Sequence, residues 1–183
     1  MSRRPTVALP VILLLAACQT GGEQPADGTA LEAAESVATG VRIAALPAFF
    51  EIASNDPEGL VLTAPALAGP NKVTITLSDV HPDGLNIIDA VEQALDNFNT
   101  LPAGQSFGQT QLVAPIGLTY MARGRYEVDG VGVEELKAML AHPWGNRLLT
   151  IAYIYPVGTD TSDRGAQLME LLGEIEPLPA PPE

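Results

Sequence analysis

Residues 73–78 read Val-Thr-Ile-Thr-Leu-Ser, a regular alternation of apolar and hydroxyl side chains. Successive side chains of a strand point to opposite faces, so this alternation predicts a half-buried β-strand. A second, shorter strand is expected at residues 60–63, between turn sequences at residues 55–59 and 69–71. The pattern therefore predicts neighbouring strands with one face toward a core.

An amphipathic helix is expected after this strand. Ile88, Val91, Leu95 and Phe98 recur at helical spacing, which predicts one buried stripe. Asn86 stands where its side chain can accept a hydrogen bond from the first helical turn, and so it is the expected N-cap. The opposite face carries the carboxylates of Asp89, Glu92 and Asp96. Carboxylates on the outer face of a helix are usually solvated, and we favour that interpretation over an acid–base site.

The C-terminal half alternates between β and helical patterns. Residues 109–128 predict one or two strands, and residues 133–141 predict a short helix with Val133, Leu136 and Leu140 on one face. Residues 148–157 are apolar on both faces, as in a covered central strand. The acidic and hydroxyl residues at 160–163 predict the cap of a last helix. The core candidates of 109–128 are Leu112, Val113, Ile116, Leu118, Tyr120 and Tyr126, and those of the last helix are Leu168, Leu171, Leu172 and Ile175.

The segments outside these elements are less regular. A Thr-Ala-Leu-Glu capping box at residues 29–32 predicts a short helix over residues 30–38. Residues 41–54 fit a strand or a helix, and Pro47 interrupts either. The element order predicts the α+β class, an antiparallel sheet with helices packed on it. Over residues 42–176 this order resembles the Mog1/PsbP-like α/β/α sandwich of DcrB-type envelope lipoproteins. That resemblance implies a non-catalytic accessory or scaffold protein and carries over no site residues.

The N-terminus carries a secretory signal pattern. Arg3 and Arg4 precede an apolar stretch at residues 7–17, and the sequence Leu-Ala-Ala leads to Cys18, the single cysteine. The Leu-Ala-Ala-Cys ending resembles the lipobox of bacterial lipoproteins, which implies acylation of Cys18. Eleven apolar residues are too few for a transmembrane anchor, which needs about 20. An ordinary cleaved signal with Cys18 as a passenger is the alternative.

Four regions follow from these patterns. We expect a lipoprotein signal peptide at residues 1–18, a flexible tether and short helix at 19–40, a single α+β domain at 41–176, and a Pro-rich tail at 177–183. The net charge of −13 argues against nucleic acid as a partner, since phosphate binding needs Lys and Arg. It also argues against electrostatic docking on anionic lipid, so membrane attachment depends on acyl chains at Cys18.

Three motifs invite catalytic or binding interpretations. Gly104-Gln-Ser106-Phe-Gly108 spells a nucleophile elbow, but a helix end precedes it and a strand follows it, the reverse of a hydrolase elbow. The His-Pro-x-Gly sequences at His81 and His142 fit type I turns better than a metal site. We expect Trp144 to fold back over the sheet edge rather than to anchor a partner. Arg123 and Arg125 share one strand face and can bind an anion, although acidic surface groups are their favoured partners.

These observations favour a lipid-anchored envelope protein that binds or scaffolds, with no enzymatic activity, cofactor or metal. Cys18 is the one expected site residue, as the point of lipid attachment. Gln19 is not the aspartate that typically retains lipoproteins at the inner membrane, so the resemblance implies the outer membrane, facing the periplasm. The expected partners are the membrane, through the acyl chains, and an unidentified envelope protein. The alternatives are a small serine hydrolase using Ser106 and a carrier of a small apolar ligand between helix and sheet.

Overall fold

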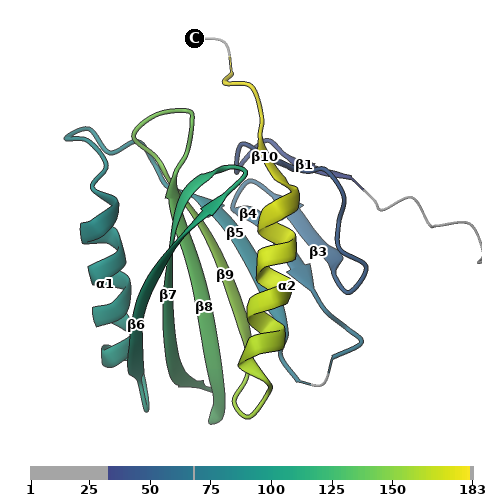
Figure 1. Cartoon of the computed structure of the whole chain (residues 1–183), viewed down its shortest axis with the longest axis vertical. Coiled ribbons are helices and arrows are strands. Elements are labelled where there is room, and N and C mark those ends of the chain that lie inside the picture. Colours follow the sequence, from purple (N-terminus) through teal and green to yellow (C-terminus); the bar gives the residue numbers. More distant parts are fainter. Residues whose placement is uncertain (1–32, 68, 182–183) are drawn as a thin grey trace, which may run out of the picture.

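A computed structural model describes residues 33–67 and 69–181 of the chain (Figure 1). Among these residues, seven antiparallel strands form the main sheet, in the order β3-β4-β5-β9-β8-β7-β6. Three short strands form a second antiparallel sheet, in the order β1-β2-β10. Two helices, α1 (Ile87–Thr100) and α2 (Thr161–Glu174), pack against the main sheet. The strands are β1 (Ala34–Ser36), β2 (Val41–Ile43), β3 (Glu51–Asp56), β4 (Gly59–Thr63), β5 (Lys72–Leu77), β6 (Gln105–Ala114), β7 (Gly117–Val128), β8 (Val131–Ala141), β9 (Leu148–Pro156) and β10 (Ile175–Pro177).

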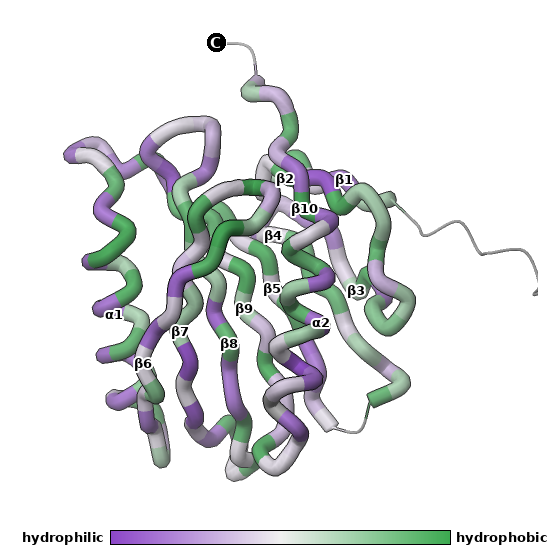
Figure 2. Tube along the Cα trace, in the orientation of Figure 1, coloured by the Kyte–Doolittle hydropathy of each residue, from purple (hydrophilic) through white to green (hydrophobic). Residues whose placement is uncertain are grey.

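The two helices cover opposite faces of the main sheet. Alternate residues of β8 enter different cores, because successive side chains of a strand point to opposite faces. Val133 and Met139 pack with α1, whereas Leu136, Ala138 and Leu140 belong to the core that includes α2. The α+β class and the layered helix–sheet–helix arrangement are therefore confirmed. Both helices show alternating polar and apolar segments along the chain, as expected of elements with one buried face (Figure 2).

Several elements lie where the sequence predicts them. Strands β4, β5 and β9 match the expected strands, and β6 and β7 occupy the region expected to hold one or two. The side chain of Asn86 accepts a hydrogen bond from the backbone N–H of Ile88 and caps α1. The side chain of Asp160 accepts one from Ser162 and caps α2. The apolar residues Leu168, Leu171 and Leu172 are buried as expected.

The buried stripe of α1 differs in two positions from the expected one. Val91 and Phe98 are buried as expected, but Ile88 is exposed. Ala94 is buried in place of its neighbour Leu95, which is half-buried. The prediction of buried core residues in 109–128 is also wrong at two positions. Val113 and Leu118 are directly opposite on β6 and β7 and face solvent, with 82% and 51% of their surface exposed. The hairpin buries Ala114 instead, and it buries Ile116 as predicted.

The short helix expected at residues 133–141 is wrong, because these residues lie in the central strand β8. Val133, Leu136 and Leu140 fit a helical stripe, but a strand covered on both faces is also apolar at irregular spacing. Glu134 and Glu135, which resemble the solvated face of a helix, are both buried in the sheet. Tertiary pairing with β7 and β9 thus overrides the helical propensity of the segment.

The expectations for both ends of the domain also change. The described part of residues 30–38 forms strand β1 and a turn, so the short helix expected there is wrong. Pro177, placed in the tail from sequence, ends the edge strand β10, where its missing N–H is tolerated. The ambiguous segment at residues 41–54 contains strand β2 and the start of β3. No helix in the described residues has the length and apolar character needed to cross a membrane.

Candidate functional site

Two arginines of β7 share one buried carboxylate of β8. Arg123 donates to Glu134 Oε2 over 2.9 Å, and Arg125 donates to Glu134 Oε1 over 2.6 Å. The hydroxyl of Tyr155 on β9 also donates to Oε2, over 3.3 Å. Glu134 is only 3% exposed, whereas the two arginine side chains are partly open to solvent. The buried carboxylate therefore holds two guanidinium groups in fixed positions at the surface.

The β7–β8 turn sets this geometry. Asp129 and Gly130 both have positive φ, +51° and +77°, as a two-residue type I′ hairpin turn requires. The turn places Val128 opposite Val131, and counting back along both strands places Arg125 opposite Glu134. Opposite residues share one face of a sheet, so their side chains meet. Arg123 lies on the same face, two residues further along β7.

A bulge in β6 brings an aromatic ring over the arginines. Ser106 pairs with Gly124 and Gln109 pairs with Ala122, which leaves Phe107 and Gly108 opposite the single residue Arg123. Gly108 has a φ of +94°, a conformation that favours glycine. The Phe107 ring centre lies 4.9 Å from the Arg123 guanidinium carbon and 5.5 Å from that of Arg125, within range of cation–π attraction. We call Phe107, Arg123, Arg125 and Glu134 the arginine platform.

A cleft of about 230 Å³ adjoins the platform. Phe107 and Arg123 are platform residues that also line the cleft, and Met121 and Leu136 form its apolar walls. A guanidinium beside apolar walls can bind an anionic group and exclude water from it, which strengthens the interaction. Bulges are frequent next to binding sites, where they redirect a side chain as this one redirects Phe107.

The arginines favour the ionised form of Glu134. Burial alone raises the pKa of Glu134, but hydrogen bonds from Arg125 and Arg123 and their positive charges outweigh burial and lower the pKa overall. The platform places two guanidinium groups side by side in a chain of net charge −13. The sequence predicts acidic groups as the partners of these arginines, and the carboxylate that both contact, Glu134, is buried.

A second carboxylate network lies on the opposite face of β8, beneath α1. Tyr126 donates to Glu135 Oε2 over 2.9 Å, and Lys137 lies 3.2 Å from Oε1. Burial raises the pKa of Tyr126 strongly, and the charge of Glu135 and the hydrogen bond to it raise the pKa further. Because α1 covers this network, we assign it to the core and not to a binding surface.

Ser106 does not lie in a nucleophile elbow. It belongs to the strand β6, after helix α1, and it is not among the residues with positive φ. In the described part of the chain, the Ser106 hydroxyl accepts a hydrogen bond from the Asn99 amide over 3.1 Å, and its backbone N–H donates to Asn99 over 2.8 Å. An amide nitrogen that donates cannot take a proton, so this neighbour does not activate the hydroxyl. The arrangement fastens the start of β6 to α1.

The two His-Pro-x-Gly segments form the expected turns. The N–H of Gly84 donates to His81 O, and the N–H of Gly145 donates to His142 O, each over 3.1 Å. The N–H of His81 also donates to Asn146 O, so the two turns lie side by side. Among the described residues, no three His, Cys, Asp or Glu side chains gather closely enough to hold a metal ion.

His142 and Trp144 connect the turn to both ends of the domain. The N–H of Trp144 donates to His142 Nδ1, so the ring proton lies on Nε2, which donates to Gly40 O over 2.9 Å. The indole N–H donates to Leu178 O over 2.9 Å. Trp144 therefore folds back, as expected, although its polar contact is to the C-terminal segment. We call Gly40, His142, Trp144 and Leu178 the terminal clasp.

We expect the clasp to weaken in mild acid. Burial lowers the pKa of His142 below its ordinary 6.5; the hydrogen bond to Gly40 opposes this, and the charge of Arg147 adds to it. Between the folded and unfolded pKa values the unfolded chain binds more protons, so stability falls as pH decreases below about 6.5. Urea unfolding of the wild type and of His142→Gln at pH 7.5, 6.5 and 5.5 tests this. The wild type should lose more stability over this range, and equal slopes would contradict the assignment.

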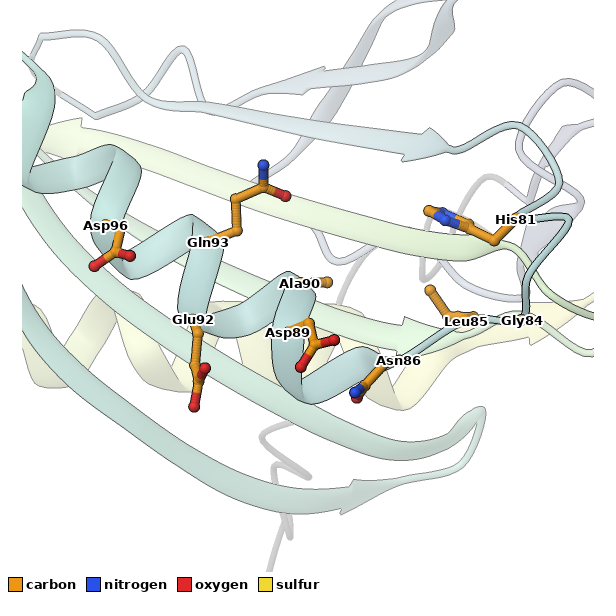
Figure 3. A pocket seen from close by; sticks show the side chains of 9 residues that line it. All are labelled: His81, Gly84, Leu85, Asn86, Asp89, Ala90, Glu92, Gln93 and Asp96. Atoms are coloured by element: carbon orange, nitrogen blue, oxygen red, sulfur yellow. The ribbon is translucent and has the colours of Figure 1, made fainter.

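The acidic residues of α1 border a separate open groove. It has a volume of about 560 Å³ and runs from His81 along α1 to Asp96. Figure 3 shows that Asp89, Glu92 and Asp96 project from successive parts of the helix and point neither toward one another nor toward His81. All three are exposed. Their separation does not favour an acid–base site.

In the described part of the chain, buried apolar side chains occupy both helix–sheet interfaces, where the carrier hypothesis places a ligand. Under α1, Val91, Ala94 and Phe98 pack with Ala122 and Tyr126, and all five are buried. On the other face, Leu168, Leu171, Leu172, Ile151 and Tyr153 form a continuous core. Cys18, the expected lipid attachment site, lies outside the described residues.

The comparisons with known proteins show similarity at the level of the fold. No protein-family model and no curated protein sequence matches the chain. The solution structure of cyanobacterial PsbP (CyanoP) from Synechocystis sp. PCC 6803 is 13% identical, with a TM-score of 0.55, covering 85% of this chain and 98% of that one. The Saccharomyces cerevisiae Ran-binding protein Mog1p is 10% identical, with a TM-score of 0.55, covering 80% and 95%.

A third structure is that of a bacterial protein. LpqN, involved in cell envelope biogenesis of Mycobacterium tuberculosis, is 16% identical with a TM-score of 0.51, covering 73% of this chain and 81% of that one. The Mog1/PsbP-like fold expected from the element order is therefore confirmed. At these identities the similarity concerns the fold alone.

Proposed function

We propose that this chain is a lipid-anchored, non-catalytic binding protein of the bacterial envelope, and that the arginine platform is its binding surface. The observation that carries the binding role is the platform itself. Arg123 and Arg125 are held in place by a buried carboxylate and an aromatic ring, beside a cleft with apolar walls. Such fixed guanidinium groups lose little freedom on binding an anionic group. The favoured partner is an envelope protein that presents a carboxylate.

The anchor is proposed from the lipobox-like sequence ending at Cys18. One acyl chain alone gives only marginal membrane binding, so stable residence needs two or more. Gln19 supports the outer membrane, facing the periplasm, as the destination. The envelope role of LpqN, a protein of the same fold, is consistent with this setting.

Replacing the cysteine tests the anchor directly. Cys18→Ser is expected to move the protein from the membrane fraction to a soluble or unprocessed form, because the hydroxyl cannot form the thioether to lipid. Fractionation and intact mass of the native protein measure this. Normal membrane residence of Cys18→Ser, or a native mass with a free thiol, would contradict acylation.

In vivo photo-crosslinking tests the binding surface. A photoreactive phenylalanine analogue at position 107 keeps an aromatic ring over the arginines and lies at the edge of the cleft. We expect a crosslinked envelope protein from position 107, and its loss when Arg123 and Arg125 are both changed to Gln. The matched control carries the analogue at the exposed position of Asp89. A partner captured equally at both positions, or unaffected by the arginine changes, would contradict the platform's role.

A further inference from the structure

The strand β6 forms an unusual open edge of the main sheet. It is ten residues long, it ends the strand order, and its sequence Gln-Ser-Phe-Gly-Gln-Thr-Gln-Leu-Val-Ala contains no charged residue and no proline. Natural proteins usually protect a sheet edge with charge, proline or short length, because unpaired backbone groups can pair with another strand. The opposite edge, β3, has such protection: it is six residues long and it carries Glu51 and Asp56.

An exposed apolar pair lies beside this edge. Val113 of β6 and Leu118 of β7 are cross-strand partners and are the expected core residues that the structure leaves in solvent. Large apolar side chains scattered singly need no explanation, but a pair next to an open edge extends the surface available to a partner. Both features occur at the end of β6 that lies beyond the bulge at Phe107 and Gly108.

The absence of charged side chains on β6 allows a second copy of this chain to approach at this edge. A second copy of a chain with net charge −13 is repelled over most of its surface. Along β6 there is no side-chain charge to oppose a close approach. The edge of a strand can also pair with the same edge of a second copy. A two-fold axis makes the two strands antiparallel, so that backbone donors of one copy face backbone acceptors of the other.

We propose that β6 pairs antiparallel with β6 of a second copy of this chain. Residues 109–114, beyond the bulge, form the intermolecular ladder, and the two sheets become one continuous sheet. The two-fold axis brings Val113 of each copy to the junction, where the added strand covers part of its exposed surface. This interface does not depend on acylation of Cys18. It shares Gln109 and Thr110 with the lining of the cleft beside the arginine platform.

Thiol crosslinking and mass measurement test the interface. In a Cys18→Ser background, Gln111→Cys carries the sole thiol of the chain and is expected to form an intermolecular disulfide on mild oxidation. The matched control is Ala53→Cys on β3, which is also exposed and is expected to remain monomeric. Light scattering of the full-length Cys18→Ser protein should give the mass of a dimer.

Lysine substitutions on β6 provide a second test of the proposed interface. Gln111→Lys with Val113→Lys should halve the scattering mass, because two copies would bring four lysines together at the junction. Both positions are exposed within one copy, so the variant should keep the fold of the parent, which circular dichroism measures. The proposal fails if the parent is a monomer up to its solubility limit, if the double lysine variant remains a dimer, or if β6 crosslinks only to a different protein.

Discussion

Gly124→Ala is expected to lower the free energy of unfolding by about 2–3 kcal/mol. Gly124 lies on β7 directly beneath the Phe98 ring of α1, and an added Cβ would fall far inside van der Waals contact of three ring carbons. The ring cannot easily move away, since Phe98 is buried, stacks on Tyr126 and lies under the Lys137 ammonium group. The helix must therefore shift from the sheet or the ring must leave its rotamer. Urea unfolding measures the loss.

The chain offers a matched control for this substitution. Gly173 lies in α2, is exposed, and has open space where a Cβ would be added. Gly173→Ala should raise stability by about 0.5–1 kcal/mol, because alanine loses less backbone entropy in a helix than glycine. In the double variant Gly124→Ala with Phe98→Leu, the smaller side chain should recover part of the loss caused by Gly124→Ala. A Gly124→Ala protein as stable as the wild type would show that α1 does not pack this closely on β7.

The elements predicted well are those whose structure depends on local sequence. β5 has a strict alternation of side chains, and Asn86 and Asp160 cap their helices through bonds within two residues. β8 was missed because its character depends on neighbours far along the chain. Its Glu and Leu residues favour a helix locally, and only pairing with β7 and β9 makes it a strand with two buried faces.

Two of the four platform residues could be predicted from the sequence. Arg123 and Arg125 are an evident pair on one strand face, but Glu134 was hidden by its assignment to a helix. The Asp129-Gly130 dipeptide was the available signal, because Asp-Gly between apolar residues marks a two-residue hairpin. That turn alone fixes Arg125 opposite Glu134. Phe107 could not be placed in this way, since its position depends on the bulge at Gly108.

The glycines of the elbow-like motif have structural roles instead of catalytic ones. A Cβ on Gly104 would overlap the carbonyl oxygen of Phe98, so glycine allows the chain to leave α1 closely. Gly108 provides the positive φ of the bulge. Both glycines of this motif therefore serve the connection between α1 and β6. Ser106, which lies between them, forms hydrogen bonds with Asn99.

Glu134→Gln is expected to lower the free energy of unfolding by about 2–4 kcal/mol at pH 7. The substitution removes a buried charge that two guanidinium groups and Tyr155 all contact, and it takes from Arg123 and Arg125 the carboxylate that they share. The partial exposure of both arginines keeps the loss below that of a fully buried pair. Urea unfolding at pH 7 measures the difference. Glu176→Gln is the matched control, since Glu176 pairs with Arg42 at an exposed site and should contribute less than about 1 kcal/mol.

The pH dependence of Glu134→Gln separates the lost charge from altered packing. The folded pKa of Glu134 lies below its ordinary 4.5, so its contribution is complete above that pH and decreases as pH falls through the folded pKa. The wild type should therefore lose stability more steeply than Glu134→Gln between about pH 5 and pH 3. Parallel curves would mean that the carboxylate is not stabilised by the arginines. In that case Arg123 and Arg125 are not held in place, and the platform loses the rigidity on which its proposed binding role depends.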